Sequence, residues 1–288
     1  MIFSASVFSV LALSVGQAMS YDPTCSDNVF YFSLFLGQNS GGSQQTLSAY
    51  CQDTVIDAFQ IAFVNKFFST GGMPELDLGV FPGTNLANCQ FLAADIQTCQ
   101  EKGKLTSSVL NSDADGVTLA NNIWNLFLGG SSSARPFGSA VLDGVDLDIE
   151  VGAPTGYAAF VNQIRMLSAG ASKHYYVTAA PQCPFPDAHI GGALDAAPFD
   201  AVYVQAWDFD QWDTWAKGSL NPNAKVFIGA PASSAAGGGY VNAATLDSIV
   251  TATRAQYSSL GGVMLWDASA AYGTSALDIL SRFALMTI

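Results

Sequence analysis

The stretch Asp143-Gly144-Val145-Asp146-Leu147-Asp148-Ile149-Glu150 decides the fold of this chain. Its polar and apolar residues alternate, and a β-strand sends successive side chains to opposite faces, so Asp146, Asp148 and Glu150 share one face. Three carboxylates on an inward face would be costly in a closed core. A barrel of parallel strands tolerates them, because the carboxyl end of each strand opens into a cleft that Glu150 would reach.

The carboxylates of this strand also predict a chemistry. Like charges in a confined site raise the pKa of at least one member, which keeps a carboxylic acid protonated for general-acid catalysis. The other explanation is a solvated acidic strand at a sheet edge. The apolar residues Val145, Leu147 and Ile149 argue against it, since they require a buried opposite face.

Short apolar runs alternate with helical patterns along the rest of the chain. The expected strands are 29–36, 58–64, 140–149, 175–180, 201–206, 225–230 and 262–266, and the clearest helices are 119–128, 156–169 and 243–257. A weak eighth strand is expected between Cys99 and Trp124, around residues 104–110. This alternation predicts a parallel α/β sheet, and the strand number favours a (β/α)₈ TIM barrel with a degraded third strand. No GxGxxG motif follows a strand, so a dinucleotide-binding fold has no support.

The amino-acid composition argues against several classes of binding partner. The chain has 288 residues, of which 50% are hydrophobic and 11% charged, enough for one large core. Its net charge of -13 argues against nucleic acid or an anionic membrane as a partner, whereas a neutral polysaccharide makes no electrostatic demand. With two histidines and no CxxC motif, neither a metal site nor a cofactor is expected.

The N-terminus has the pattern of a signal peptide. An apolar segment, 2–15, precedes small residues at Ala18 and Ser20, which predicts removal of residues 1–20 and a secreted, extracellular domain over 21–288. The alternative is an apolar first strand or buried helix of the mature fold. No later run approaches the ~18 apolar residues of a membrane span. In an oxidising compartment, the odd number of cysteines would leave one unpaired; they are Cys25, Cys51, Cys89, Cys99 and Cys183.

The acidic strand resembles the DGxDxDxE signature of glycoside hydrolase family 18. Other segments are similar to the strands of the hevamine-like class III chitinases of plants and fungi, and the similarity covers nearly all of the mature chain. These segments are Gly37-Gln38-Asn39, 61–67, 178–187, 202–205 and 262–266.

The resemblance implies a substrate-assisted, retaining mechanism. Glu150 would protonate the glycosidic oxygen, while Asp148 would orient the substrate acetamide and stabilise the oxazolinium intermediate. Asp146 would share a proton with Asp148. The expected substrate-binding residues are Gln205, Trp266, Gln38 and Asp143. Trp266 could instead be a core aromatic, and Gln38 could have a loop role only.

The sequence departs from the family pattern in two places. The SxGG motif of the third strand is absent between Cys99 and Trp124, and the Tyr-containing loop after the sixth strand is missing beyond Gln205. Trp207 falls at the Tyr position if no gap is allowed. Either the cleft is reduced in this protein or the sequence lacks coding segments.

The family pattern also bears on the cysteines. The counterpart of Cys183 bonds to a cysteine in the missing loop, so the resemblance leaves Cys183 unpaired. It implies Cys51 with Cys99 as the best disulfide candidate, whereas Cys25 with Cys89 is a guess.

The function expected first is an endochitinase that acts on chitin or N-acetylglucosamine oligomers as a monomer. A carbohydrate-binding or inhibitor protein on the same scaffold is the second hypothesis, because of the missing segments. An enzyme that cleaves the chitobiose core of N-glycans is the third, since the same residues serve both reactions.

Overall fold

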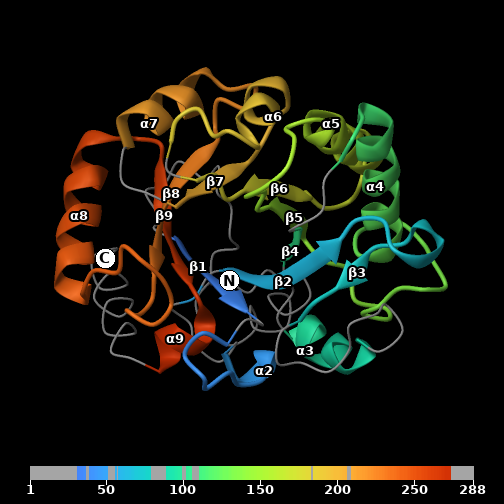
Figure 1. The fold of residues 1–288 in the computed structure, drawn as a ribbon, viewed down its shortest axis with the longest axis horizontal. Helices are drawn as coiled ribbons and strands as arrows, with labels where there is room; N and C mark the ends of the chain where they lie inside the picture. The colour runs from blue at the N-terminus through green and yellow to red at the C-terminus, as the bar shows by residue number, and fades with distance from the viewer. Residues whose placement is uncertain are drawn as a thin grey trace.

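The computed structural model describes residues 31–36, 39–50, 56, 58–78, 89–98, 102–105, 110–182, 184–205 and 209–273. Within these ranges the chain forms a closed barrel of parallel strands surrounded by helices (Figure 1). No helix in the described part of the chain has the length and apolar character needed to span a membrane.

The barrel confirms the expected TIM fold. Neighbouring strands pair in parallel in the order β1-β2-β4-β5-β6-β7-β8-β9, and β9 pairs back with β1 to close the sheet. Their bounds are β1 Tyr31–Leu36, β2 Ala58–Lys66, β4 Lys102–Leu105, β5 Gly144–Leu147, β6 Tyr176–Ala179, β7 Ala201–Val204, β8 Lys225–Pro231 and β9 Leu260–Trp266. The two-residue strand β3 (Glu75–Leu76) is antiparallel to the end of β2.

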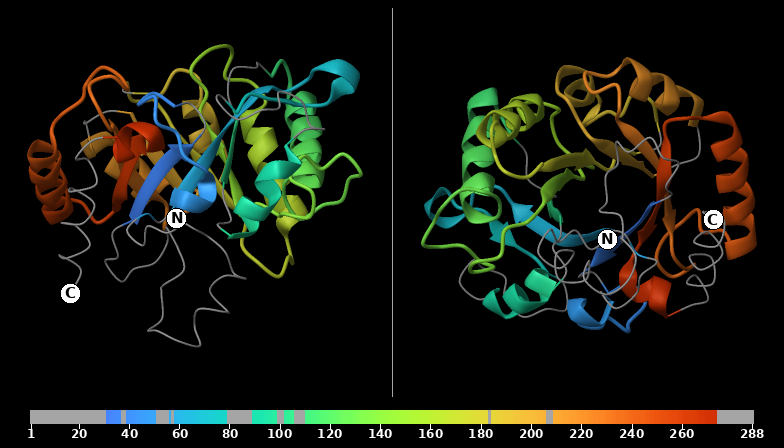
Figure 2. Two further views of the ribbon diagram at one scale, coloured as in Figure 1. Left: turned by 90° about the horizontal axis from the view of Figure 1, so that it is seen from below. Right: turned by 180° about the vertical axis from the view of Figure 1, so that it is seen from behind.

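Helices form the outer ring, and the views in Figure 2 show them outside the strands from the side and from behind. They are α2 Leu47–Tyr50, α3 Ala93–Thr98, α4 Asp113–Leu126, α5 Tyr157–Ser168, α6 Gly191–Ala196, α7 Phe209–Gly218, α8 Ala243–Gln256 and α9 Ala268–Tyr272, with 3₁₀ turns at Thr70–Gly72 and Gln90–Leu92. Helices α4 and α8 begin at side-chain caps: Ser112 accepts from the Asp115 N–H, and Asn242 accepts from the Thr245 N–H.

The third barrel strand exists despite its unfavourable composition. It is formed by Lys102–Leu105, slightly earlier than the expected 104–110, and pairs with β2 on one side and β5 on the other. Lys and Gly have low β propensity, but a segment between two strands that both offer backbone partners is held by its context. Residues 106–109, next to the missing SxGG motif, lie outside the described residues.

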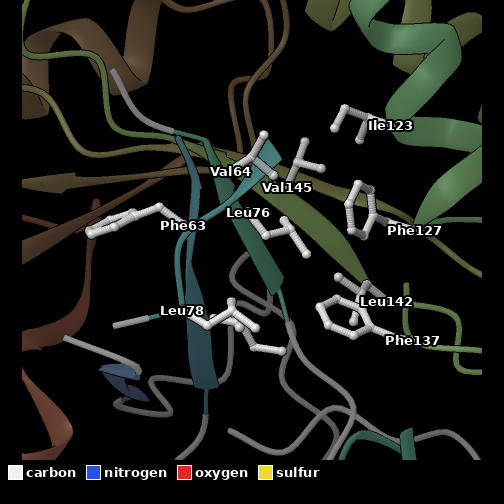
Figure 3. A pocket seen from close by; sticks show the side chains of 10 residues that line it. Phe63, Val64, Leu76, Leu78, Ile123, Phe127, Phe137, Leu142 and Val145 are labelled. Atoms are coloured by element: carbon white, nitrogen blue, oxygen red, sulfur yellow. The ribbon is translucent and has the colours of Figure 1, made fainter. Parts of the chain in front are cut away.

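The apolar core has two layers. The larger packs the outward faces of the strands against the helices, and a smaller cluster fills the barrel interior with Ala58, Ala180, Ala201, Tyr203, Phe227 and Met264. A register shift between Ile61 and Val64 interrupts the alternation of β2. Figure 3 shows the consequence: Phe63 points to the opposite side of β2 from Val64, Leu76 and Val145, although all four border an apolar cavity beside α4. The shift therefore turns Phe63 toward the interior cluster.

Candidate active site

The acidic residues of β5 and its carboxyl end form a graded series. Asp146 is 0% exposed, Asp148 is 6% exposed and Glu150 is exposed to solvent. The strand ends at Leu147, so Asp148 and Glu150 lie just beyond it, at the end of the barrel where active sites of this fold are built. The alternation in the sequence thus carries through to a buried, an almost buried and an accessible carboxylate.

Thr178 of β6 supports the lowest carboxylate. Its hydroxyl donates to Asp146 Oδ1 at 2.6 Å, and both side chains are fully buried. The two residues are register partners across the parallel β5–β6 ladder, which places them side by side. A short hydrogen bond to a carboxylate is among the stronger ones, so Thr178 fixes the rotamer of Asp146.

Gln205 links the two upper carboxylates. Its Nε2 donates to Asp148 Oδ1 at 3.0 Å and to Glu150 Oε1 at 3.1 Å, and lies 3.1 Å from the Ala180 carbonyl oxygen. Its own backbone N–H donates to the Pro181 carbonyl, which holds the end of β7 against β6. An amide nitrogen carries two hydrogens, so these three acceptors compete for two donors. Gln205 therefore orients the carboxylates and can release one of them when a ligand arrives.

Trp266 ends β9 at the same mouth of the barrel. It is half-buried, and its ring stacks on that of Phe63 with centroids 5.7 Å apart and an interplanar angle of 17°. This arrangement supports the indole from one side and leaves part of it accessible. Sequence reasoning missed Phe63, because the irregularity that turns it inward belongs to the pairing of β2 and has no local sequence signal.

Asp267 anchors the backbone beside Trp266 and was also missed. It is fully buried, accepts from the Ser269 hydroxyl at 2.7 Å and from the Ala270 N–H at 3.0 Å, and so begins α9. Its second oxygen accepts from the Ser40 N–H at 2.9 Å. One carboxylate thereby ties the segment after β1 to the end of β9. An Asp directly after a strand and before a short helix is the signal that could have identified it.

Loops beyond β5 and β6 are joined to each other. His189 Nδ1 lies 2.8 Å from the Gly152 carbonyl oxygen, two residues past Glu150. Asp187, which is buried, accepts from the backbone N–H groups of Gln182, His189 and Ile190 at 2.7 Å each. These bonds hold the segment that carries Glu150 against the loop that follows β6.

The structure places Asp143 apart from the other expected substrate-binding residues that it describes. Asp143 lies at the amino end of β5, the opposite end from Glu150, and is buried. Lys173 Nζ donates to its Oδ1 at 2.8 Å and to the Val141 carbonyl at 3.2 Å. Residues at this end of a TIM barrel serve stability, so the Asp143–Lys173 pair is structural.

Several expected site residues lie outside the described residues. They are Gln38, Trp207, Cys51, Cys99, Cys25 and Cys183, and residues 1–30. Cys89 is buried, and burial raises the pKa of its thiol. Within the described ranges, no group of three or more His, Cys, Asp or Glu side chains could hold a metal ion.

Known proteins resemble this chain both in sequence and in structure. Residues 100–255 match the family model of the glycosyl hydrolases family 18. The chain is 45% identical to Chitinase 1 of Rhizopus niveus over 280 residues, which is 86% of this chain and 55% of that protein. The chain therefore spans about half the length of the curated relatives it matches.

Two solved structures are similar over nearly their whole length. The chitinase ICChI of Ipomoea carnea has a TM-score of 0.76 at 28% identity, covering 88% of this chain and 99% of that one. A xylanase and alpha-amylase inhibitor protein of Scadoxus multiflorus has a TM-score of 0.72 at 28% identity, covering 90% of this chain and 99% of that one. The same scaffold thus carries an enzyme in one protein and an inhibitor in the other.

Proposed function

This chain belongs to the glycosyl hydrolases family 18, and from that membership we propose that it is an endochitinase. It hydrolyses the β-1,4 linkages between N-acetylglucosamine units of chitin, with retention of configuration. The observation that carries the proposal is the shared amide of Gln205, which joins Asp148 to the accessible Glu150 above the buried Asp146.

In this mechanism the substrate supplies the nucleophile. Glu150 gives its proton to the glycosidic oxygen as the bond to the anomeric carbon breaks. The acetamide carbonyl oxygen of the same sugar attacks that carbon and forms an oxazolinium ion. Glu150 then takes a proton from a water molecule, which attacks the anomeric carbon and opens the oxazolinium ring. This step restores the acetamide of the sugar and the protonated form of Glu150. The exposed position of Glu150 suits a group that must reach a linkage and then a water.

Asp148 is the residue that meets the acetamide. Its carboxylate accepts from the acetamide N–H and offsets the positive charge that develops on the oxazolinium ion. In the structure, Gln205 Nε2 donates to Oδ1 of this carboxylate. Because Gln205 has more acceptors than hydrogens, transfer of Asp148 to the acetamide leaves the amide with the Ala180 carbonyl and Glu150. The Trp266 ring, supported by Phe63, forms the apolar floor beneath the sugar.

Hydrolysis of a soluble chitin oligomer by the purified protein, with Glu150→Gln as the diagnostic variant, tests the proposal. The amide keeps the shape of the acid and loses its proton, so turnover is expected to fall by about 10³-fold. Asp113→Asn, an equivalent change on the exposed first turn of α4, serves as the matched control. Activity that persists in the Glu150→Gln variant would exclude Glu150 as the proton donor.

A second function is favoured by two observations. The solved inhibitor protein has a similar fold, and this sequence lacks the Tyr-containing loop that donates to the acetamide in the family. Loss of one transition-state donor typically costs about 10²- to 10³-fold in rate. The alternative is therefore a carbohydrate-binding protein without detectable hydrolytic activity. Chitin-oligomer binding with no detectable turnover would establish it, whereas measurable turnover that depends on Glu150 would exclude it.

Secretion and a disulfide belong to the same proposal. The apolar segment before Ala18 supports export, which N-terminal sequencing of the secreted chain would test.

A disulfide between Cys51 and Cys99 is supported by the hydrogen bond from the Ser48 N–H to Asp95 at 3.2 Å. This bond joins the two helices that directly precede the cysteines. Mass spectrometry before and after reduction would detect the bond. We expect a monomer by size-exclusion chromatography.

A further inference from the structure

A groove lies on the outer wall of the barrel, between α6 and α7, which are neighbours in the helical ring (Figure 1). Its volume is about 410 Å³, within the usual range for small-molecule sites. Its walls combine aromatic, amide and carboxylate side chains, of which the principal ones are Phe185, Asp195, Asp210, Gln211, Trp215 and Leu220.

None of the proposed catalytic residues lines this groove. Phe185 follows β6, and Asp210 lies in the first turn of α7, which follows β7, so this end of the groove lies toward the rim that carries Glu150. Leu220 lies beyond the other end of α7, roughly 15 Å away for a helix of this length. The groove therefore runs from the catalytic rim down the outside of the barrel, a path suited to an extended chain.

The aromatic side chains on the apolar side of the groove are held in place by contacts with the buried Trp212. Phe185 meets Trp212 edge to face with centroids 5.0 Å apart, and Trp212 meets Trp215 at 6.0 Å. Trp215 is almost fully buried, and its indole N–H finds no acceptor among the described residues. At the lower end, Leu220 is 61% exposed and extends the apolar surface.

The polar side of the groove offers acceptors. Asp195, Asp210 and Gln211 are exposed, and Oδ1 of Asp210 is held by the Tyr257 hydroxyl, which fixes that carboxylate. None of the described residues that line the groove is basic. Carboxylates without a cation disfavour anions and favour hydroxyl donors. Aromatic and apolar surface beside hydroxyl acceptors is the combination that a neutral sugar chain requires.

We propose that the groove between α6 and α7 is a second carbohydrate site, which holds a chitin chain outside the catalytic mouth. That the polymer is chitin follows from the proposed function, whereas the existence of a site is inferred from the lining residues of the groove alone. The site would retain the enzyme on insoluble polymer and would contribute nothing to the hydrolysis of an oligomer too short to reach both places.

The test compares binding to insoluble chitin with turnover of a short soluble chitin oligomer. The first variant is Leu220→Ser and the second is Asp195→Ala with Gln211→Ala, all at exposed positions where folding is not at risk. Each is expected to weaken binding to insoluble chitin by about tenfold, as for the loss of one or two contacts, with unchanged kcat/KM on the oligomer. Met166→Ser is the matched control, since Met166 is 63% exposed on α5.

Other outcomes separate the two proposals. Wild-type binding in both groove variants would overturn the second site, whatever the hydrolytic activity. An equal fall in oligomer turnover and in polymer binding would also overturn it, because the groove would then belong to the catalytic site. Groove-dependent binding to deacetylated chitosan but not to chitin would overturn the ligand assigned here. Groove-dependent chitin binding by a protein with no turnover would support the site and defeat the proposed endochitinase.

Discussion

The side-chain amide of Gln205 donates to Asp148 at 3.0 Å, although the two residues directly follow β7 and β5, the strands on either side of β6. The same nitrogen is 3.1 Å from Glu150. This amide therefore holds Asp148 and Glu150, the upper two carboxylates of the acidic series, together.

Replacing Gln205 tests that role. Gln205→Ala is expected to lower kcat/KM on a chitin oligomer by about 10²-fold, because an oriented donor to both carboxylates is lost. Gln205→Glu should be more damaging, since it adds a like charge. Gln163→Ala is the control, because Gln163 donates to Asn121 between helices outside the barrel. A Gln205→Ala enzyme within twofold of the wild type would show that the amide does not organise the site.

The hydroxyl of Thr178 is expected to support both stability and catalysis. Thr178→Val keeps the shape of the side chain and deprives buried Asp146 of a donor, at a cost of about 1–3 kcal/mol in the free energy of unfolding. It should also lower kcat by about tenfold or more while leaving KM nearly unchanged, because a displaced Asp146 misplaces Asp148. Thr178→Ser restores the donor and should restore kcat. Equal kcat in the Val and Ser variants would remove Thr178 from the mechanism.

Asp143 should be separable from catalysis. Asp143→Asn breaks the pair with Lys173 at the far end of β5 and is expected to lower the free energy of unfolding by about 2 kcal/mol. Its kcat/KM should stay within about twofold of the wild type, whereas Asp148→Asn, two residues from Glu150 on the same segment, should lose most activity. A large fall in kcat/KM for Asp143→Asn, measured on protein shown to be folded, would restore it to the substrate site.

Asp200 is expected to make stability depend on pH. It is buried; Arg165 donates to it at 2.8 Å and the Val177 N–H at 2.7 Å, and His174 Nε2 lies 3.0 Å from it. Burial is the largest influence and raises its pKa, but the hydrogen bond with His174 and the charge of Arg165 together hold the pKa of Asp200 below its usual value.

Because the folded-state pKa is depressed, this stabilisation is present above the unfolded pKa near 4 and is lost as the pH falls through the folded value. Asp200→Asn should therefore lower the free energy of unfolding by about 3 kcal/mol at pH 7. The difference from the wild type should shrink below about pH 4, as denaturant titrations between pH 3 and 8 would measure. Glu75→Gln, in an exposed pair with Lys66, is the control and should change stability little. A difference that is constant with pH would contradict the assignment.

The parts of the fold that could be predicted were those with a strong local pattern. The apolar runs at β2, β8 and β9 and the helical pattern at α8 identified real elements within a few residues. The third barrel strand was the weakest expectation and was placed at 104–110, whereas β4 begins with Lys102-Gly103-Lys104, which lacks the residues that strands favour. Its strand conformation comes from pairing with β2 and β5 on either side, and the sequence of these four residues does not predict that pairing.

The sequence by itself determined the order of the acidic series, since the two-residue period of a strand is a local property that places Asp146, Asp148 and Glu150 on one face. Only the tertiary structure decided which side chains contact these carboxylates. Closure and register of the barrel bring Thr178 and Gln205 beside the carboxylates, and a shift in the pairing of β2 turns Phe63 under Trp266. Such lateral contacts depend on how strands far apart in the chain align, and a local pattern carries no record of that alignment.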